Sequence, residues 1–147
     1  MAVHKVDGVD GTNHFPKKFV NLHCTTAAIT KGDWVCIDVT STTNGRGASC
    51  KKTGTSIDAT AFGVACETTT VASVIRVQTA GLCDFALLTT GVSVSEPLIC
   101  DATAGAASLF DEGDAGAPVG VYISSDGTSD GVATATNRVM IIDQGYF

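Results

Sequence analysis

Few side chains in this sequence are placed to carry out acid–base or nucleophilic chemistry. All three histidines, His4, His14 and His23, lie within the first 25 residues. A Ser/His/Asp or Cys/His arrangement would therefore need this segment to fold back over the rest of the chain. Threonine is abundant throughout, but that abundance is typical of strands and indicates no nucleophile. We predict that the protein has no catalytic residues and is not an enzyme.

A short acidic cluster offers the main alternative to that view. Asp111, Glu112 and Asp114 stand close together in the sequence, and such carboxylates could bind a cation or act as an acid/base pair. The D-x-D-x-D-G spacing of a calcium loop is absent. We favour a solvated turn and expect no metal and no cofactor, while a small enzyme that uses this loop remains an alternative.

The cysteines are isolated from one another in the sequence. They are Cys24, Cys36, Cys50, Cys66, Cys83 and Cys100. No C-x-x-C or C-x-C pair occurs and no histidine follows position 23, so a zinc site would have to be assembled from distant strands. The start of the chain lacks the pattern of a secretion signal, so disulfides are also disfavoured. Buried free thiols are the favoured interpretation, with disulfides formed after release, or a metal site, as alternatives.

The charge balance and the hydropathy pattern disfavour several classes of partner. The chain carries nine Lys and Arg residues against 15 Asp and Glu residues, a net charge of −6, and its basic residues are scattered. We therefore expect no direct contact with nucleic acid, which needs a basic face. No run of about 18 apolar residues occurs, so we expect no membrane partner. The Gly-rich segment 41–56 lacks the G-x-x-x-x-G-K-[ST] order of a phosphate-binding loop.

Residues 61–85, AFGVACETTTVASVIRVQTAGLCDF, organise the expected fold. Apolar and small residues alternate at first, and a polar turn from Glu67 to Thr70 then interrupts them. A β-branched run follows and ends at Gly81, beyond which a short strand reaches Phe85. This order predicts a strand, a turn, a long strand, a corner and a further strand.

The second half of the chain repeats this pattern. Residues 30–33 precede the strand WVCID in the same way that residues 93–96 precede PLICD, at an offset of 63 residues. A hairpin that begins with Gly-Val occurs at Gly63 and again at Gly120, and the last expected strand is 138–142. We predict an all-β fold, a small β-barrel or sandwich built from two related strand-hairpin repeats.

The N-terminal residues 1–25 sustain neither a strand period nor a helix period, and Pro16 interrupts any strand. We predict an extended N-terminal arm here, followed by a β-rich domain at 26–147. Ordering about 20 residues costs on the order of 20 to 40 kcal/mol of backbone entropy, so the arm needs an acceptor such as the sheet edge of a neighbouring subunit. A frayed terminus is the alternative.

Several segments together resemble the small capsid decoration, or cement, proteins of tailed bacteriophages. They are ITKGDWVCID, the 61–85 segment, GVSVSEPLICDATAGA, APVGVYISSDGT and RVMIID, within residues 29–143. The resemblance implies a β-rich domain that binds the outside of an expanded icosahedral head, commonly as a homotrimer, with an N-terminal arm on the major capsid protein. It therefore implies a virion protein of the outer capsid surface, made in the host cytoplasm, whose partners are the major capsid protein and its own copies.

The expected binding residues follow from this assignment. We predict that the arm attaches to the capsid and that the C-terminal aromatic residues, Tyr146 and Phe147, pack at a subunit interface. The arm residues that we expect to bind the capsid are Val3, Val6, Phe15, Phe19 and Leu22. By bridging neighbouring capsid proteins, the protein would stabilise the expanded capsid. The alternative from another class is a head-fibre or adhesin module that binds carbohydrate or a host surface.

Overall fold

The computed structural model describes residues 16–25, 27–40, 49–54, 60–70, 73–100, 103–124 and 126–145. Within these ranges the chain forms nine strands and no helix, and so has no helix long and apolar enough to cross a membrane. The strands are β1 (Lys18–Cys24), β2 (Trp34–Ile37), β3 (Ser49–Lys52), β4 (Ala61–Ala65), β5 (Val74–Leu87), β6 (Pro97–Cys100), β7 (Ala107–Leu109), β8 (Gly120–Tyr122) and β9 (Ala135–Ile141). The all-β class expected from the sequence is confirmed.

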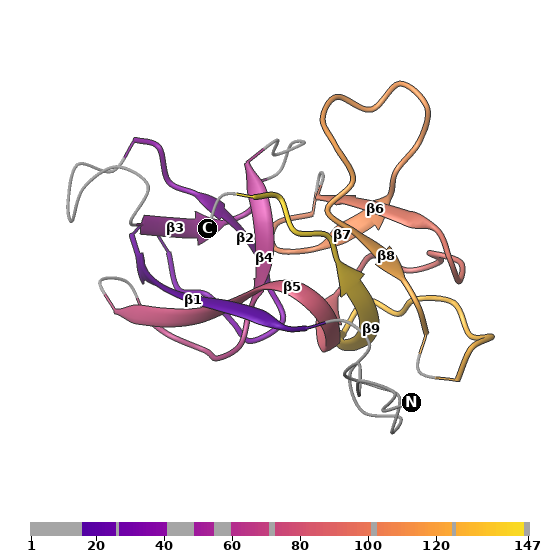
Figure 1. Ribbon diagram of the computed structural model, residues 1–147, viewed down its shortest axis with the longest axis horizontal. Helices are drawn as coiled ribbons and strands as arrows, with labels where there is room; N and C mark the ends of the chain where they lie inside the picture. The colour runs from indigo at the N-terminus through magenta and orange to yellow at the C-terminus, as the bar shows by residue number, and fades with distance from the viewer. Residues whose placement is uncertain are drawn as a thin grey trace, which may run out of the picture.

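The first five strands close into a barrel (Figure 1). The order around it is β1-β3-β2-β4-β5, and β5 pairs with β1 again. β1 and β3 are parallel, whereas the other neighbouring pairs are antiparallel. Closure gives each of these strands a partner on both sides, which is how small β proteins avoid exposed edges.

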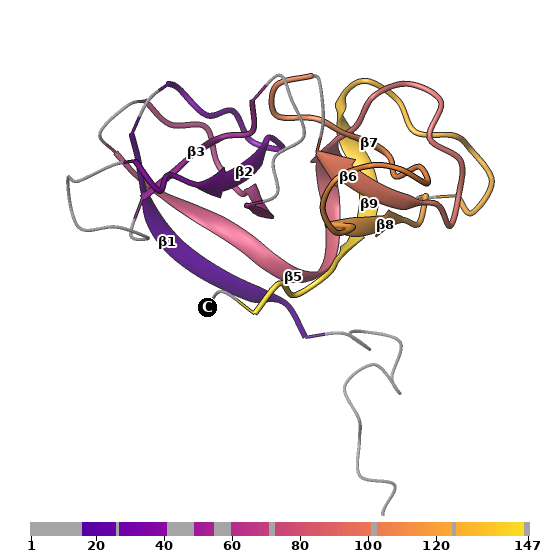
Figure 2. The ribbon, with the colours of Figure 1, turned by 90° about the horizontal axis from the view of Figure 1, so that it is seen from above.

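Strand β5 is shared between the two halves of the molecule. Its first part pairs with β1 and β4, and from Gly81 onward it pairs with β9 instead. Gly81 has a φ of 85°, a left-handed conformation that glycine adopts without steric cost. Figure 2 shows the strand bending where it passes from one half to the other. The corner expected at Gly81 is therefore a bend inside a single long strand.

The remaining strands and the second part of β5 form a unit with the same connectivity, which a single isolated bridge closes, and we refer to it as the second barrel. Its order is β5-β9-β8-β6-β7, and a parallel bridge between Leu88 and Ala107 brings the end of β5 back to β7. In each half the first strand therefore runs parallel to the third, and the order around the barrel is first, third, second, fourth, fifth. This shared topology confirms the two repeats expected from the sequence.

The turn that leads into the second strand is the same in both barrels. In the first barrel the Asp33 N–H donates to the carbonyl of Thr30 at 2.9 Å, and the Asp33 carboxylate accepts from the Thr30 N–H at 2.8 Å. In the second barrel Glu96 and Ser93 make the same two hydrogen bonds, at 3.3 and 2.7 Å. The offset of 63 residues in the sequence therefore aligns two structurally equivalent turns.

Gly63 and Gly120 occupy equivalent places in β4 and β8. A Cβ atom at Gly63 would lie 2.4 Å from the carbonyl oxygen of Gln78, and one at Gly120 would lie 2.8 Å from that of Met140. Both distances are shorter than a normal contact, so the fourth strand of each barrel approaches the fifth this closely only with glycine here. The repeated Gly-Val pattern in the sequence marks this close approach.

Two apolar clusters fill the barrels, and several side chains of β2 and β4 belong to the cluster of the second barrel. Leu22, Ile75 and Val77 belong to the cluster inside the first barrel. Trp34 begins β2 of the first barrel but packs in the cluster that fills the second, and none of its surface is exposed. Its Nε1 donates to the carbonyl oxygen of Leu87 at 3.1 Å. The two barrels are therefore packed together as one domain.

The predicted arm is wrong over its last residues. Lys18–Cys24 forms β1, which pairs with β5 of the same chain. Leu22 is only 5% exposed and lies in the core of the first barrel, so it is not available to a capsid, whereas Phe19 is 39% exposed. The segment does not need a neighbouring subunit to order it, because β5 of the same chain supplies partners for the backbone hydrogen bonds of β1.

The remaining predicted binding residues lie outside the described part of the chain. They are Val3, Val6, Phe15, Tyr146 and Phe147. The domain itself has to begin before residue 26, because β1 is part of the barrel wall.

Candidate functional site

The barrels enclose most of the thiol groups. Cys66 is partly buried, the other five cysteines are buried, and none of the six forms a disulfide. Burial raises the pKa of Cys50 and of Cys83 to about 12, so both thiols are protonated and unreactive at neutral pH. The expected buried thiols are confirmed, with Cys66 as the partial exception. Among the described residues, no group of three or more His, Cys, Asp and Glu side chains could hold a metal ion.

The residues considered for acid–base chemistry lie in separate parts of the molecule. His23 is in β1 of the first barrel, whereas Asp111 and Asp114 follow β7 in the second. Because these elements belong to different barrels, the structure does not bring His23 to the acidic turn. His4 and His14 lie outside the described residues.

A partly buried ion pair in the first barrel joins the turn before β2 to the end of β3. The Lys52 Nζ lies 3.0 Å from Oδ2 of Asp33, whose side chain is only 5% exposed. The same carboxylate oxygen accepts the Thr30 N–H at 2.8 Å. The pair therefore holds the turn against the end of β3 and serves the fold. The sequence does not reveal it, because the contact depends on how the strands are arranged in the barrel.

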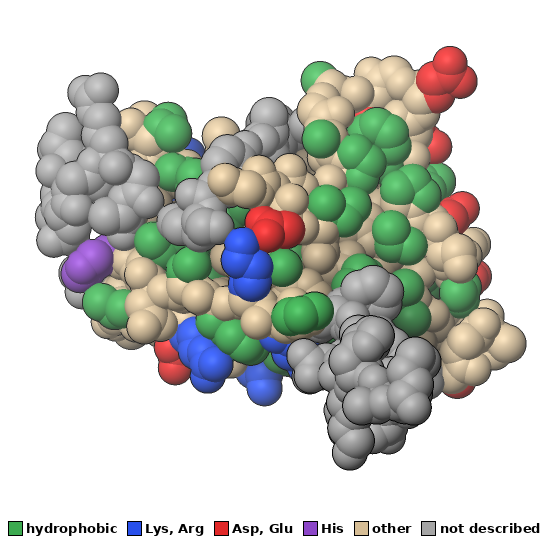
Figure 3. Space-filling model, in the orientation of Figure 1, with side chains coloured by type: hydrophobic (Ala, Val, Ile, Leu, Met, Phe, Trp, Pro, Cys, Tyr) green, Lys and Arg blue, Asp and Glu red, His purple; other side chains and the backbone are tan. Residues whose placement is uncertain are grey.

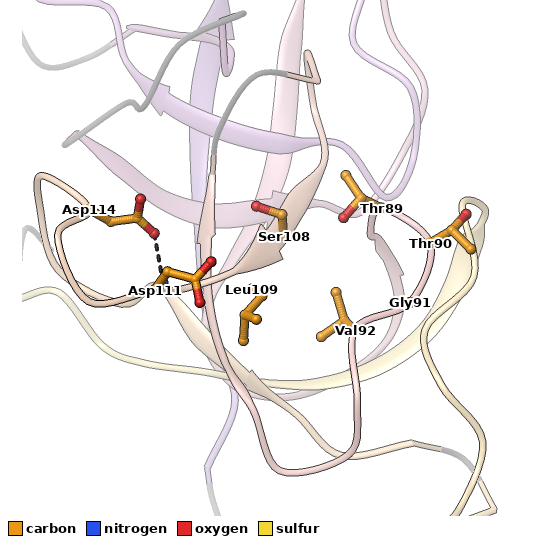
Figure 4. Close-up of a pocket in the computed structure, with 8 residues that line it drawn as sticks. All are labelled: Thr89, Thr90, Gly91, Val92, Ser108, Leu109, Asp111 and Asp114. Atoms are coloured by element: carbon orange, nitrogen blue, oxygen red, sulfur yellow. Dashed lines mark hydrogen bonds between the residues drawn. The ribbon is translucent and has the colours of Figure 1, made fainter.

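The acidic segment from Asp111 to Asp114 forms a closed turn. The Asp111 N–H donates to Oδ2 of Asp114 at 2.8 Å, and the Asp114 N–H donates to the carbonyl of Asp111 at 3.1 Å. Asp111 and Glu112 are exposed to solvent. The solvated turn expected from the sequence is confirmed, and the Asp111 carboxylate is turned away from Asp114 (Figure 4).

This turn is one wall of an open pocket on the second barrel (Figure 4). The pocket has a volume of roughly 280 Å³. Its other walls are residues 89–92, which follow β5, and Ser108 and Leu109 of β7. The lining therefore combines carboxylates, hydroxyl groups and a small apolar surface. The sequence marks only the acidic part of it, because hydroxyl side chains occur throughout the chain and carry no local signal.

The two barrels differ strongly in charge. Residues 1–80 contain eight Lys and Arg residues and six Asp and Glu residues. Residues 81–147 contain one Arg and nine Asp and Glu residues. Figure 3 shows basic side chains gathered over β1 and β5 and most of the acidic ones on the second barrel. The Arg76 guanidinium lies 4.0 Å from the centre of the exposed Phe19 ring, a cation–π contact on the outside of the first barrel. We refer to this pair as the Phe19–Arg76 face.

Comparison with known proteins gives a structural match and no sequence match. No protein-family model matches the chain, and no curated protein matches it. The fold is similar to the crystal structure of the N base of head fibre gp8.5 in bacteriophage phi29, with a TM-score of 0.56 and 9% sequence identity. The match covers 87% of this chain and 96% of that chain. At this identity the match shows a common fold, and membership of the decoration-protein family is not shown.

Proposed function

We propose that this protein is a non-catalytic structural component of a bacteriophage head, bound at the outer capsid surface of the virion. The observation that carries the proposal is the fold shared with a head fibre base, which extends over 96% of that chain. The sequence resemblance to capsid decoration proteins points to the same place in the virion. The high pKa values of Cys50 and Cys83 agree with a structural use of these thiols.

In this proposal the protein binds the major capsid protein and bridges neighbouring capsid subunits. A protein that binds the closed shell and not the opened one stabilises the shell by mass action. Assembly as a homotrimer would add avidity, so that modest contacts from each copy are sufficient. The protein is made in the host cytoplasm and assembles onto the expanded head.

Attachment in this proposal uses the residues ahead of β1 together with the Phe19–Arg76 face. Val3, Val6 and Phe15 remain the proposed anchors, and Tyr146 and Phe147 remain the proposed subunit contacts. Leu22 is withdrawn from this set because it fills the core of its own barrel. Exposed aromatic and arginine side chains are frequent in the residues that dominate binding energy, which supports the use of the Phe19–Arg76 face.

The head fibre match favours a second candidate, a fibre base whose exposed side binds carbohydrate or a host surface. Such a base would attach to the head without bridging its subunits. Only the bridging protein should raise the temperature at which heads rupture, because only bridging opposes the opening of the shell.

The test uses purified heads that lack the protein, mixed with the full chain or with a chain that starts at residue 16. Pelleting measures attachment, and thermal rupture of the heads measures bridging. We expect the full chain to pellet with heads and raise the rupture temperature, and the shortened chain to lose most binding. Attachment without a rise would favour the fibre base, and no attachment would overturn both candidates.

A matched pair of variants tests the Phe19–Arg76 face in the same assay. Arg76→Glu reverses a charge on this face, whereas Lys51→Glu reverses one on β3. We expect Arg76→Glu to weaken head binding by about tenfold, the effect of losing a favourable exposed contact and adding a repulsive one. Equal effects of the two variants would mean that net charge, and not this face, governs attachment.

A further inference from the structure

The pocket of the second barrel has a counterpart in the first. Thr25 and Thr89 both follow the first strand of their barrel, and their N–H groups donate to equivalent carbonyls of the third strand, at 3.2 and 2.9 Å. The register of the second and third strands places Lys52 in the first barrel where Leu109 stands in the second. The same position on the repeated frame can therefore be compared between the two barrels.

In the first barrel the polar groups at this position are used by the fold. The Thr25 hydroxyl donates to the carboxylate of Asp38. The Lys52 ammonium group pairs with Asp33 at 3.0 Å. Both side chains thereby hold neighbouring segments of the first barrel together.

In the second barrel the corresponding groups line the pocket. Leu109 replaces the lysine and contributes apolar surface beside Val92. Within the part of the chain that the structure describes, the Thr89 hydroxyl and the Asp111 carboxylate have no hydrogen-bond partner. The pocket therefore presents two polar groups that the fold does not use for hydrogen bonding: the Asp111 carboxylate, which accepts, and the Thr89 hydroxyl, which both donates and accepts. Leu109 adds an apolar surface.

We propose that this pocket binds a neutral carbohydrate, one sugar ring at a time. A carboxylate accepts hydrogen bonds from sugar hydroxyls, and threonine hydroxyls both donate and accept them. Leu109, which is partly exposed, contacts the apolar C–H side of the ring, whereas Val92 is only 2% exposed and belongs to the core of this barrel. The volume of roughly 280 Å³ lies at the lower end of the usual range for small-molecule pockets, about 300 Å³, which suits a single ring.

Charge and geometry disfavour other small ligands. Asp111 and Asp114 repel phosphates and other anions. A cation is disfavoured, because no cluster of three or more His, Cys, Asp or Glu side chains occurs among the described residues and one Asp114 oxygen already accepts the Asp111 N–H. No aromatic ring is among the lining residues, so we expect weak binding, with a Kd on the order of 1 mM. This inference does not rest on the proposed attachment to a phage head.

The test is a titration of the ¹⁵N-labelled full chain followed by amide chemical shifts. The probes are methyl α-D-glucopyranoside, methyl β-D-galactopyranoside and N-acetyl-D-glucosamine, each raised to about 50 mM, well above the expected Kd. We expect at least one probe to give saturable shifts confined to residues 89–92 and 108–114. The shift map reports binding directly and does not depend on any activity.

Two variants remove the proposed contacts without changing the shape of the pocket. Thr89→Val removes the hydroxyl, and Asp111→Asn removes the charge while the turn keeps its backbone hydrogen bonds. Each should weaken binding by about tenfold, the usual effect of losing one hydrogen bond to a charged or buried group. Thr128→Val and Asp130→Asn are matched controls on the same barrel outside the pocket and should leave the Kd unchanged.

Three results would each overturn the proposal. The first is the absence of saturable shifts at these amides with all three probes. The second is an unchanged Kd in both pocket variants while their spectra remain folded. The third is a saturable response of the same amides to calcium chloride but to none of the sugars, which would identify a cation site instead.

Discussion

The two barrels carry different side chains on the same hydrogen-bonded frame. The turn into the second strand closes the same two hydrogen bonds in both, and Gly63 and Gly120 allow the same close approach of the fourth strand to the fifth. Charge is divided between them, since eight of the nine basic residues lie in the first 80 residues and nine of the 15 acidic residues lie beyond. The frame depends on backbone groups and a few small residues, so other positions can diverge without loss of the fold.

Side chains at equivalent positions have different roles in the two barrels. In the first barrel Lys52 and Asp33 form an ion pair that holds the turn to β3. In the second, Leu109 stands in place of the lysine and lines an open pocket. Under our proposals, the first barrel faces the capsid and the second binds a sugar.

Removing β1 tests how far the first barrel depends on closure and should have the largest effect. A chain that starts at residue 26 loses the pairing with β5 and the buried side chains of Leu22 and Cys24. We expect a loss of about 5 kcal/mol or more, comparable to the whole stability of a small domain. Circular dichroism and thermal melting measure it. A chain that starts at residue 16 is the control and should melt within about 3 °C of the full chain; similar melting of both shortened chains would contradict the role of β1.

The paired glycines offer a sharper comparison at one equivalent position. Gly63→Ala and Gly120→Ala each force a Cβ atom against a backbone oxygen, at 2.4 and 2.8 Å before any relaxation. We expect a loss of about 2–3 kcal/mol for each, the range for overpacking, with the larger loss at Gly63. Urea unfolding measures both. Gly54→Ala is the control, because no atom lies within 4 Å of its Cβ position, and an equal loss there would refute the steric explanation.

Replacing Lys52 by an apolar residue makes this position of the first barrel resemble the equivalent position of the second, which Leu109 occupies. Lys52→Met keeps most of the side-chain volume but leaves the Asp33 carboxylate, 5% exposed, without its partner. We expect a loss of about 1–2 kcal/mol, less than for a fully buried pair because the lysine is partly exposed. Lys51→Met is the neighbouring control and should change stability by less than about 0.5 kcal/mol. Adding Asp33→Asn to Lys52→Met should recover part of the loss in urea unfolding, and no recovery would argue against an electrostatic origin.

The smallest expected effect concerns the loop that connects β8 to β9 in the second barrel. Hydrogen bonds from the Ser129 and Ser124 side chains and from the N–H groups of Ser129 and Thr128 hold the pKa of Asp126 well below its usual range. A lowered folded-state pKa means that the contribution of this carboxylate is present above the unfolded value of about 3.9 and is lost as the pH falls through the folded value. Carboxyl ¹³C shifts measured against pH should show this, and Ser129→Ala should raise the pKa of Asp126. An unchanged pKa in that variant would assign the shift to another cause.

The sequence predicts much of the frame because its signals are local. Alternation through 61–66, the polar turn at 67–70 and the bend at Gly81 all depend on neighbouring residues. The repeat is visible because residues 30–33 and 93–96 form the same turn, which requires similar side chains at the same spacing. The solvated turn at 111–114 could be predicted from the sequence for the same reason, because its residues are neighbours in the chain.

The sequence by itself determined the all-β class, the duplication and the turns, because period and turn chemistry are set by residues close together in the chain. Only the tertiary structure decided that Lys18–Cys24 is a wall of the first barrel, since its partner β5 lies far along the sequence. The same holds for the Asp33–Lys52 pair and for the pocket, which Thr89 and Asp111 both line only because β7 returns to the end of β5. Contacts between distant segments depend on strand register and barrel closure, and neither is written in any local stretch of residues.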